Sequence, residues 1–333
     1  MNFLFLAIQF AAGFALLVGG AEFLVRGASR LAVRFNLPPV LIGLTIVAFG
    51  TSLPELVVSL TAALNGADSA IAIGNIVGSN IANLGLILGL AGIMVALPVA
   101  ASFTRRELPI LLCVSLLFMI MAWLNYDIDR LEGALLVVGF GVVTWLSWRA
   151  AVTDPDFSQE VKTTVATVEA IDPQAAQPSR TIWVDVVGIV LGLVGLIVGA
   201  RWLVAAASEI ARALGVSELV IGLTLVAIGT SLPEVATSIV AVARGNADIA
   251  VGNVVGSNLF NLLAIGGITA MVSPLTVPAD MALDFGVMIL LTALVWLFAW
   301  RPRGYIARWQ AAILLGIYVL YIAQLALRSL HVV

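Results

Sequence analysis

Long apolar segments, separated by short polar ones, recur along almost the whole chain. Ten can be recognised, and most have about the 20 apolar residues that a helix needs to cross ~30 Å of hydrocarbon. They lie at residues 3–31, 38–65, 70–97, 107–125, 130–149, 182–212, 217–243, 248–275, 282–299 and 306–328. The pattern therefore predicts an all-α polytopic membrane protein with ten transmembrane helices.

One stretch between the fifth and sixth segments breaks this pattern. Residues 150–181 carry several charges, three prolines and many Thr, Ala and Gln side chains. Such a composition does not bury a core, so it predicts a short flexible linker. The chain is thus expected to divide into residues 1–149, the linker at 150–181, and residues 182–333.

The two halves repeat each other in sequence. Gly43–Glu55 reads Gly-Leu-Thr-Ile-Val-Ala-Phe-Gly-Thr-Ser-Leu-Pro-Glu, and Gly222–Glu234 differs from it at only two positions. Further on, Gly-Asn-Ile-Val-Gly-Ser-Asn at 74–80 matches Gly-Asn-Val-Val-Gly-Ser-Asn at 252–258. Because each half is expected to hold five spans, an odd number, the second half must enter the membrane from the opposite side. The sequence therefore predicts two inverted five-helix repeats.

Composition and charge narrow the class of protein. Hydrophobic residues make up 62% of the chain and charged residues 11%, and the mean hydropathy is +1.12, which is typical of membrane proteins rather than soluble domains. A net charge of −3 without a basic run does not favour nucleic-acid binding. The single cysteine, Cys113, allows neither an intrachain disulfide nor a thiolate cluster. The apolar start lacks a basic n-region, so we expect a retained span rather than a signal peptide.

The distribution of basic residues predicts the orientation. With the N-terminus outside, twelve of the 16 Lys and Arg residues fall on one side and three on the other, while Arg201 lies within a span. This positive-inside bias places both termini outside and the linker in the cytoplasm. We therefore expect an integral protein of an inner (plasma) membrane.

Glu55 and Glu234 each lie inside an apolar segment, directly after a proline. A charged, unpaired carboxylate in hydrocarbon costs roughly several kcal/mol, and neither motif contains a Lys or Arg, so a bound cation is the simplest partner. Pro54 and Pro233 cannot donate a hydrogen bond to the carbonyl four residues back. We expect both helices to break there and to turn bare carbonyls toward a cavity or ligand. A simple proline kink is the alternative, and the duplication together with the following Glu disfavours it.

Neutral oxygen ligands surround these carboxylates in the sequence. A threonine and a serine lie four and three residues before each Glu, and a serine and an asparagine four residues apart follow in the next segment, so the members of each group share a helix face. These hydroxyl and amide side chains are Thr51, Ser52, Ser79, Asn83, Thr230, Ser231, Ser257 and Asn261. Ca²⁺ and Na⁺ take such ligands, whereas transition metals favour His or Cys, and the only histidine, His331, lies at the C-terminal tail.

Helix packing is the alternative role for small polar residues in membrane spans. Interhelical hydrogen bonding is the alternative explanation for Ser79, Asn83, Ser257 and Asn261, and for Asn80 and Asn258 it is the favoured explanation. The patterns Gly74-x-x-x-Gly78 and Gly252-x-x-x-Gly256 predict close helix contacts rather than a ligand site.

The motifs resemble those of the calcium/cation antiporter superfamily, and in particular of prokaryotic sodium/calcium exchangers. The resemblance rests on the paired Gly-Thr-Ser-Leu-Pro-Glu motifs, each followed by Gly-Ser-Asn-x-x-Asn, and is strongest over residues 10–97 and 190–275. It implies a ten-helix fold with ion sites at mid-membrane. It also implies that the first helix of each half, at 3–31 and 182–212, slides against a core made by the second and third helices.

The resemblance also implies roles for individual residues. Glu55 and Glu234 would be the main Ca²⁺ ligands, shared with Na⁺. The carbonyls of Ala48 and Ala227, with Thr51 and Thr230, would complete the Ca²⁺ shell. The Na⁺ sites would use Ser52, Ser79, Asn83, Ser231, Ser257 and Asn261. Some relatives, including potassium-dependent ones, carry Asp in place of Asn261, so the Asn argues against K⁺ co-transport and leaves two carboxylates to balance Ca²⁺.

These features predict a secondary antiporter that exchanges Na⁺ for Ca²⁺ by alternating access and exports Ca²⁺. We expect no enzymatic activity, no cofactor, no nucleic acid and no obligatory protein partner; Ca²⁺, Na⁺ and the lipid bilayer are its expected partners. No Gly-x-x-x-x-Gly-Lys nucleotide motif is present.

The alternatives to this function are an H⁺/Ca²⁺ antiporter, a cation channel and a membrane enzyme. An H⁺/Ca²⁺ antiporter of the same fold is the nearest, but the Thr-Ser pairs favour Na⁺ because a proton needs only a carboxylate. A cation channel fits less well, since inverted repeats suit alternating access. A membrane enzyme lacks support, because no base–nucleophile pair or histidine cluster is evident.

Overall fold

The computed structural model is built almost entirely of helices. It describes residues 3–64, 69–124, 126–153, 181–214, 227–278, 280–300 and 304–331. Within these ranges eight helical segments are long and apolar enough to cross a membrane, and one bent pair adds a ninth. The polytopic helical fold is therefore confirmed. The predicted span at 217–243 begins in residues 215–226, which lie outside the described part, so the count of ten stays a prediction, and most of the predicted linker, at 154–180, lies outside it too.

The described elements of the first half of the chain run from α1 to α9. They are α1 (Phe3–Phe35), α2 (Pro39–Ile42), the π-helical η1 (Gly43–Val47), α3 (Ala48–Thr51), α4 (Leu53–Leu64), α5 (Ser69–Ala82), the π-helical η2 (Asn83–Ile87), α6 (Leu88–Met94), β1 (Leu97–Pro98), α7 (Ala101–Arg105), α8 (Glu107–Leu124), β2 (Asp127–Ile128) and α9 (Arg130–Thr153).

The second half follows the same order. Its elements are α11 (Ile182–Ala213), α13 (Ala227–Thr230), α14 (Leu232–Ala243), α15 (Ala247–Leu259), the π-helical η4 (Phe260–Ile265), α16 (Gly266–Val272), β3 (Leu275–Thr276), α17 (Ala282–Ala299), β4 (Tyr305–Ile306) and α18 (Arg308–His331). Each half thus has a long first helix, a helix broken before its Glu, and a third helix with a π-helical turn.

Two short antiparallel ladders, which the hydropathy pattern does not predict, join the halves. β1 pairs with β4 and β2 pairs with β3. In each ladder, the strand that follows the third helix of one half meets the strand that follows the fourth helix of the other half. This reciprocal exchange is the pairing expected of two equivalent units that face each other.

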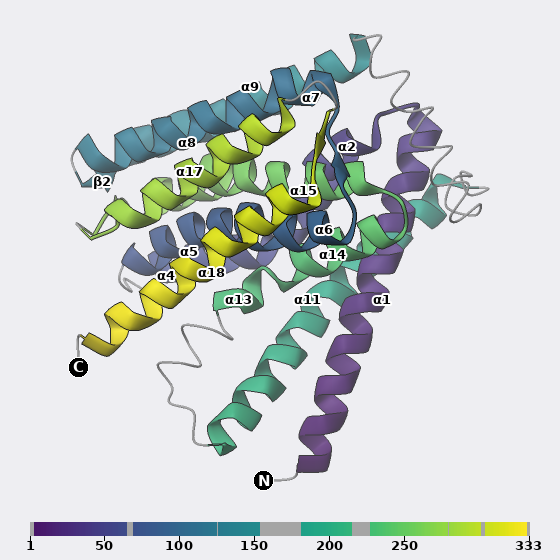
Figure 1. Ribbon diagram of the computed structural model, residues 1–333, viewed down its shortest axis with the longest axis horizontal. Coiled ribbons are helices and arrows are strands. Elements are labelled where there is room, and N and C mark those ends of the chain that lie inside the picture. The colour runs from purple at the N-terminus through teal and green to yellow at the C-terminus, as the bar shows by residue number, and fades with distance from the viewer. Residues whose placement is uncertain are drawn as a thin grey trace.

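The first helices of the two halves cross closely and run antiparallel. Gly13, Gly20 and Gly27 of α1 contact α11 at progressively earlier positions along it, near Gly199, Gly192 and Asp185 respectively. A Cβ atom built on Gly20 would lie 2.6 Å from the backbone nitrogen of Leu196. The glycines therefore permit a backbone-to-backbone contact that larger residues would prevent. Figure 1 shows α1 and α11 side by side, with one end of the pair extending away from the other helices.

The centre of the molecule is made by the third helix of each half. In the most apolar part of each span, 89% of residues are buried for Ala247–Val272 and 78% for Ala70–Met94, against 22% for α1 and 28% for α11. A helix that is apolar or small on every side is expected in such a central position. The molecule thus has a buried core and a peripheral pair of long helices.

The predicted close packing of glycines is confirmed in one half. Gly252 and Gly256 of α15 lie directly against the backbone of α2 and η1, at Val40 and Leu44. Gly74 and Gly78 of α5 have no such neighbour within 4 Å among the described residues. The segment equivalent to Val40 and Leu44 in the second half falls in residues 215–226, outside the described part.

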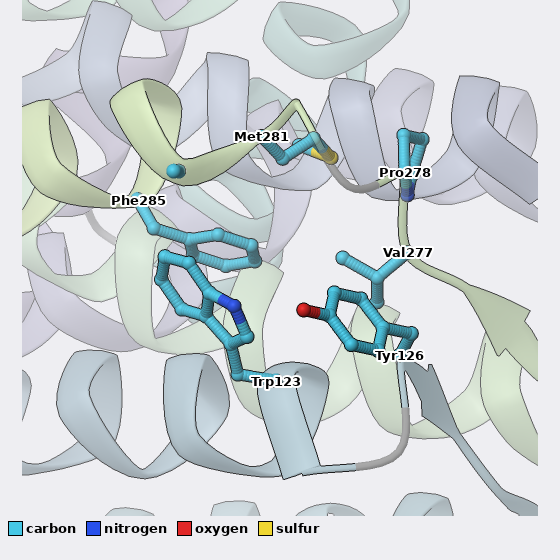
Figure 2. A pocket seen from close by; sticks show the side chains of 7 residues that line it. Trp123, Tyr126, Val277, Pro278, Met281 and Phe285 are labelled. Carbon is cyan, nitrogen blue, oxygen red and sulfur yellow. The ribbon is translucent and has the colours of Figure 1, made fainter.

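Aromatic residues pack between α8 and α17 beside the β2–β3 ladder. Trp123 and Phe285 have ring centroids 6.0 Å apart. Tyr126, in a left-handed conformation with φ of 56°, accepts a backbone hydrogen bond of 2.8 Å from Val277. Figure 2 shows the Tyr126 ring entering the pocket with its hydroxyl turned toward Trp123. The cavity left there has a volume of about 10 Å³, room for about one water molecule.

The α1–α11 crossing generates a stability prediction. We expect Gly20→Ala to lower the thermal unfolding temperature of the detergent-purified protein by an amount equivalent to about 1–3 kcal/mol, because the added methyl must push the two backbones apart. Gly19→Ala is the matched control, since a Cβ atom there meets nothing within 4 Å. Equal unfolding temperatures for the two variants would contradict the close crossing.

Candidate cation-binding site

Both helices that carry the candidate glutamates break where the prolines predict. In the first half α3 ends at Thr51, α4 begins at Leu53, and the two pieces of the span bend by 44°. In the second half α13 ends at Thr230 and α14 begins at Leu232. The serines between the pieces, Ser52 and Ser231, have nearly identical backbone angles (φ −85°, ψ 8° and φ −86°, ψ 2°). The predicted breaks are therefore confirmed in both halves.

The two glutamates meet across the interface between the halves. Ser52 Oγ donates a 2.8 Å hydrogen bond to Oε1 of Glu234, and Ser231 Oγ donates one of 3.3 Å to Oε1 of Glu55. Each carboxylate is therefore held by the serine that precedes the other one. All four residues are at most 2% exposed, and the two carboxylates are close enough to interact electrostatically. The structure thus brings the two predicted acidic residues into one buried site.

Among the residues that the structure describes, no basic side chain forms a salt bridge with Glu55 or Glu234. Oε2 of each residue is buried and has no hydrogen-bond partner. Two adjacent, buried, unpaired negative charges would cost several kcal/mol each even after relaxation. A cation between them removes that cost and uses the two orphaned oxygens as ligands.

Further buried oxygens without partners come from the neighbouring elements. Among the described residues these include Thr230 Oγ1, Asn83 Oδ1, Ser257 Oγ and the side-chain amide of Asn261. Buried polar atoms are normally hydrogen-bonded, so a group of them indicates a ligand or water that would satisfy them. The donor set of carboxylate, hydroxyl and amide oxygens suits a hard cation such as Ca²⁺ or Na⁺. No group of three or more His, Cys, Asp and Glu side chains that could hold a metal ion exists in the described residues.

π-Helical turns place several of these residues. Asn83 is the first residue of η2, Asn261 is the second of η4, and η1 ends immediately before Ala48. A π-helical turn inserts an extra residue and is frequent at functional sites, because it re-aims the side chains that follow it. η1 precedes the first break along the chain, whereas η2 packs against α14 and η4 against α4, the helices that begin after the two breaks.

The remaining predicted ligands are present, but their surroundings differ. Ser79 of α5 is buried, with 6% exposed. The Ala48 carbonyl, which the resemblance assigns to the Ca²⁺ shell, already accepts hydrogen bonds from the Ser52 amide (3.1 Å) and the Thr51 hydroxyl (3.4 Å). The Ser52 amide can reach back to Ala48 because α3 keeps its hydrogen bonding up to the break. Ala227 is the first residue of α13.

The duplicated asparagines of the third helices hydrogen-bond to one another across the halves. Asn83 Nδ2 donates to Asn258 Oδ1 at 2.9 Å, and Asn258 Nδ2 donates to the Asn80 carbonyl at 3.3 Å. The interhelical role predicted for Asn258 is confirmed. For the Asn80 side chain the prediction is wrong, because Nδ2 donates at 2.7 Å to the Ile76 carbonyl of its own helix.

Two residues that the sequence reasoning left without a role also contact the site. Asn75 Nδ2 donates to the backbone carbonyl of Glu55 (3.1 Å) and to Ser59 Oγ (2.9 Å). Asn253 Nδ2 donates to Ser238 Oγ (3.1 Å), and its Oδ1 accepts from the Thr51 hydroxyl (3.2 Å). The sequence signal for a role of these asparagines was their duplication inside the Gly-Asn-x-x-Gly motif. The motif had been interpreted through its glycines alone, as a helix contact.

Comparison with known proteins gives matches along nearly the whole chain. A family model described as sodium/calcium exchanger protein matches residues 5–149 and 184–326. The inner membrane protein YrbG of Escherichia coli (strain K12) is 36% identical over 317 residues, which cover 94% of each chain. The putative antiporter CaxA of Alkalimonas amylolytica is 38% identical over 276 residues, which cover 81% of this chain and 82% of the relative.

The fold is also found among solved structures. A structure of the sodium-calcium exchanger NCX_Mj soaked with Na⁺ and Sr²⁺ superposes with a TM-score of 0.81 and 29% sequence identity. The superposition covers 96% of this chain and 97% of that one. The similarity therefore extends over nearly the whole of both chains.

The unpaired carboxylates generate a second prediction. We expect Glu55→Gln and Glu234→Gln each to keep or raise the unfolding temperature of the purified protein without divalent cations, because each removes an uncompensated buried charge. Ca²⁺ at 100 times its dissociation constant should stabilise the unchanged protein by about 2.7 kcal/mol, and this gain should disappear in both variants. Thermal unfolding with and without Ca²⁺ measures both effects.

Glu107→Gln is the matched control for this experiment. Glu107 is also buried, with 2% exposed, but its Oε1 accepts two hydrogen bonds from the Arg106 guanidinium, at 2.6 and 2.9 Å. Its loss should lower the unfolding temperature and leave the Ca²⁺ stabilisation intact. Ca²⁺ stabilisation that survives in both site variants would contradict the proposed ligands.

Proposed function

The chain belongs to the sodium/calcium exchanger protein family, and from this premise we propose that it exchanges Na⁺ for Ca²⁺ across a membrane by alternating access. The observation that carries the proposal is the pair of buried carboxylates, Glu55 and Glu234, which come from opposite halves and have no basic partner in the described residues. Two negative charges match one Ca²⁺. The roles assigned by resemblance to the other predicted ligands form part of this proposal.

Competition for one set of oxygens would couple the two ions. Ca²⁺ prefers six to eight oxygen ligands, and the site offers two carboxylates together with several neutral oxygens. Several Na⁺ ions would use the same carboxylates, so Ca²⁺ and Na⁺ would not occupy the site together. If the helices move only when the carboxylates are neutralised, empty carriers do not cycle, and an inward Na⁺ gradient drives Ca²⁺ out of the cell without ATP.

The arrangement of the two halves supports alternating access. Equivalent helices α1 and α11 run antiparallel, and the β ladders exchange strands reciprocally, as inverted repeats require. We propose that this α1–α11 pair slides as a unit over the core that carries the glutamates. The glycine crossing keeps the pair together. The most apolar part of each helix is only 22% or 28% buried, while residues such as Leu24 and Ala28 in the second half of α1 pack in the core.

Polar contacts tie α1 to the core at one end only in the described part of the chain. Glu22 pairs with Arg244 at 2.6 Å, and Ser29 Oγ donates to Asn246 Oδ1 at 2.8 Å. Arg201, the equivalent of Glu22 in α11, is exposed and does not form an ion pair with Glu22. The basic residues of this end suggest the cytoplasmic face. We infer that these contacts close the cytoplasmic side, with both termini outside.

Proton coupling is the second candidate function. Adjacent buried carboxylates without a basic partner could also be neutralised by protons, which would make the chain an H⁺/Ca²⁺ antiporter. The hydroxyls of Ser52 and Ser231 at the carboxylates, and the unpartnered amide of Asn261, favour Na⁺ because a proton would not need them.

Transport assays in reconstituted vesicles test the coupling ion. We expect vesicles loaded with Na⁺ to accumulate radioactive Ca²⁺ when diluted into Na⁺-free buffer, and a pH gradient without Na⁺ to drive no uptake. Glu234→Gln should abolish the Na⁺-driven uptake, and Glu107→Gln should retain it. Uptake that follows the pH gradient alone would overturn Na⁺ coupling in favour of protons.

A further inference from the structure

We infer that Asn253 is a positioning residue that makes the Thr51 hydroxyl a ligand for the transported cation. This inference rests on the proposed function, because it takes Thr51 as part of the Ca²⁺ shell. Asn253 lies on α15 in the second half, whereas Thr51 ends α3 in the first half. The residue therefore acts across the interface between the halves.

The Asn253 amide lies between two hydroxyls. Its Nδ2 donates to Ser238 Oγ at 3.1 Å, and its Oδ1 faces Thr51. Thr51 Oγ1 donates to that Oδ1 at 3.2 Å. Asn253, Ser238 and Thr51 are all fully buried, so no bulk water competes for these bonds. In this arrangement Thr51 is the donor and Ser238 the acceptor.

That arrangement decides what Thr51 can bind. A hydroxyl has one hydrogen and two lone pairs, and it can coordinate a cation only with a lone pair. The Glu234 carboxylate is a further acceptor within reach of the Thr51 hydroxyl. When Asn253 accepts the hydrogen, Thr51 Oγ1 presents a lone pair beside this carboxylate instead, and a cation between the two oxygens satisfies both.

Asn253 also affects a second predicted ligand. The Ala48 carbonyl also lies within reach of the Thr51 hydroxyl, at 3.4 Å. If Asn253 were absent, the hydrogen would turn to Ala48 or to the Glu234 carboxylate, and the oxygen that accepts it would be a worse ligand. Outer groups that orient metal ligands in this way typically contribute 10–100-fold to metal affinity.

The equivalent residues of the other half are arranged differently. Asn75 corresponds to Asn253, but it donates to the Glu55 carbonyl and Ser59 rather than accepting from a threonine. Thr230, the counterpart of Thr51, has no hydrogen-bond partner for its hydroxyl. Asn75 therefore serves as a matched control, because it has the same residue type and motif position without the contact to a threonine hydroxyl.

A double-mutant cycle tests the inference. Equilibrium binding of radioactive Ca²⁺ to the purified full chain is measured for Asn253→Ala, Thr51→Val and the double variant. We expect Asn253→Ala to weaken Ca²⁺ binding about tenfold when Thr51 is present. In the Thr51→Val background its further effect should be below about twofold, since the residue through which it acts has gone.

Two more variants separate positioning from folding. Asn75→Ala should change Ca²⁺ binding by the same factor with and without Thr51→Val. Ser238→Ala removes only the anchor of the Asn253 amide, so it should weaken Ca²⁺ binding less than Asn253→Ala does, and only when Thr51 is intact. It also keeps the test available if Asn253→Ala does not fold.

The outcomes distinguish this inference from the proposed exchange. If Asn253→Ala weakens Ca²⁺ binding by the same factor with and without the Thr51 hydroxyl, and Ser238→Ala likewise, the positioning role is overturned and only a structural role is left. The expected coupling in Ca²⁺ binding, without Na⁺-driven uptake in vesicles, would support the positioning role and overturn the proposed exchange. A wild-type protein that does not bind Ca²⁺ would overturn both.

Discussion

Two carboxylates held side by side, away from water and without a basic partner, are the constraint on which this structure depends. Glu55 and Glu234 reach each other only because the chain breaks before each of them, and because each accepts a hydrogen bond from the serine of the opposite half. In a stable soluble core such an arrangement would be a defect. In a carrier it is useful, since the site is favourable only when a cation occupies it, and the need for that cation can control movement.

The rest of the fold divides into parts that fix this site and parts that we propose to move past it. α15 is buried along nearly its whole length and holds α2 and η1 at glycine contacts, so the site is carried on a closely packed centre. α1 and α11 instead contact each other through glycines, and only 22% and 28% of the residues in their most apolar parts are buried. Contacts such as Glu22–Arg244 connect the two parts at one end, which is where a sliding motion would have to break them.

The sequence was sufficient where a local physical rule decided the outcome. Pro54 and Pro233 break their helices because proline lacks an N–H, whatever surrounds it. The duplicated motifs likewise identified Glu55 and Glu234 as a pair. Contacts across the halves were beyond such rules: no pattern could assign Ser52 to Glu234 rather than to its neighbour Glu55, or Asn253 to Thr51. Asn80 was misassigned because its own helix offered a nearer acceptor. The two-residue β ladders were too short to leave a periodic signal.

An experimental structure of the protein determined with Ca²⁺, and again with Na⁺ alone, tests the central claim most directly. The account predicts one Ca²⁺ within about 2.6 Å of carboxylate oxygens from both Glu55 and Glu234, replaced by Na⁺ at the same oxygens in the second structure. A Ca²⁺ bound elsewhere, or two carboxylates too far apart to share an ion, would contradict it.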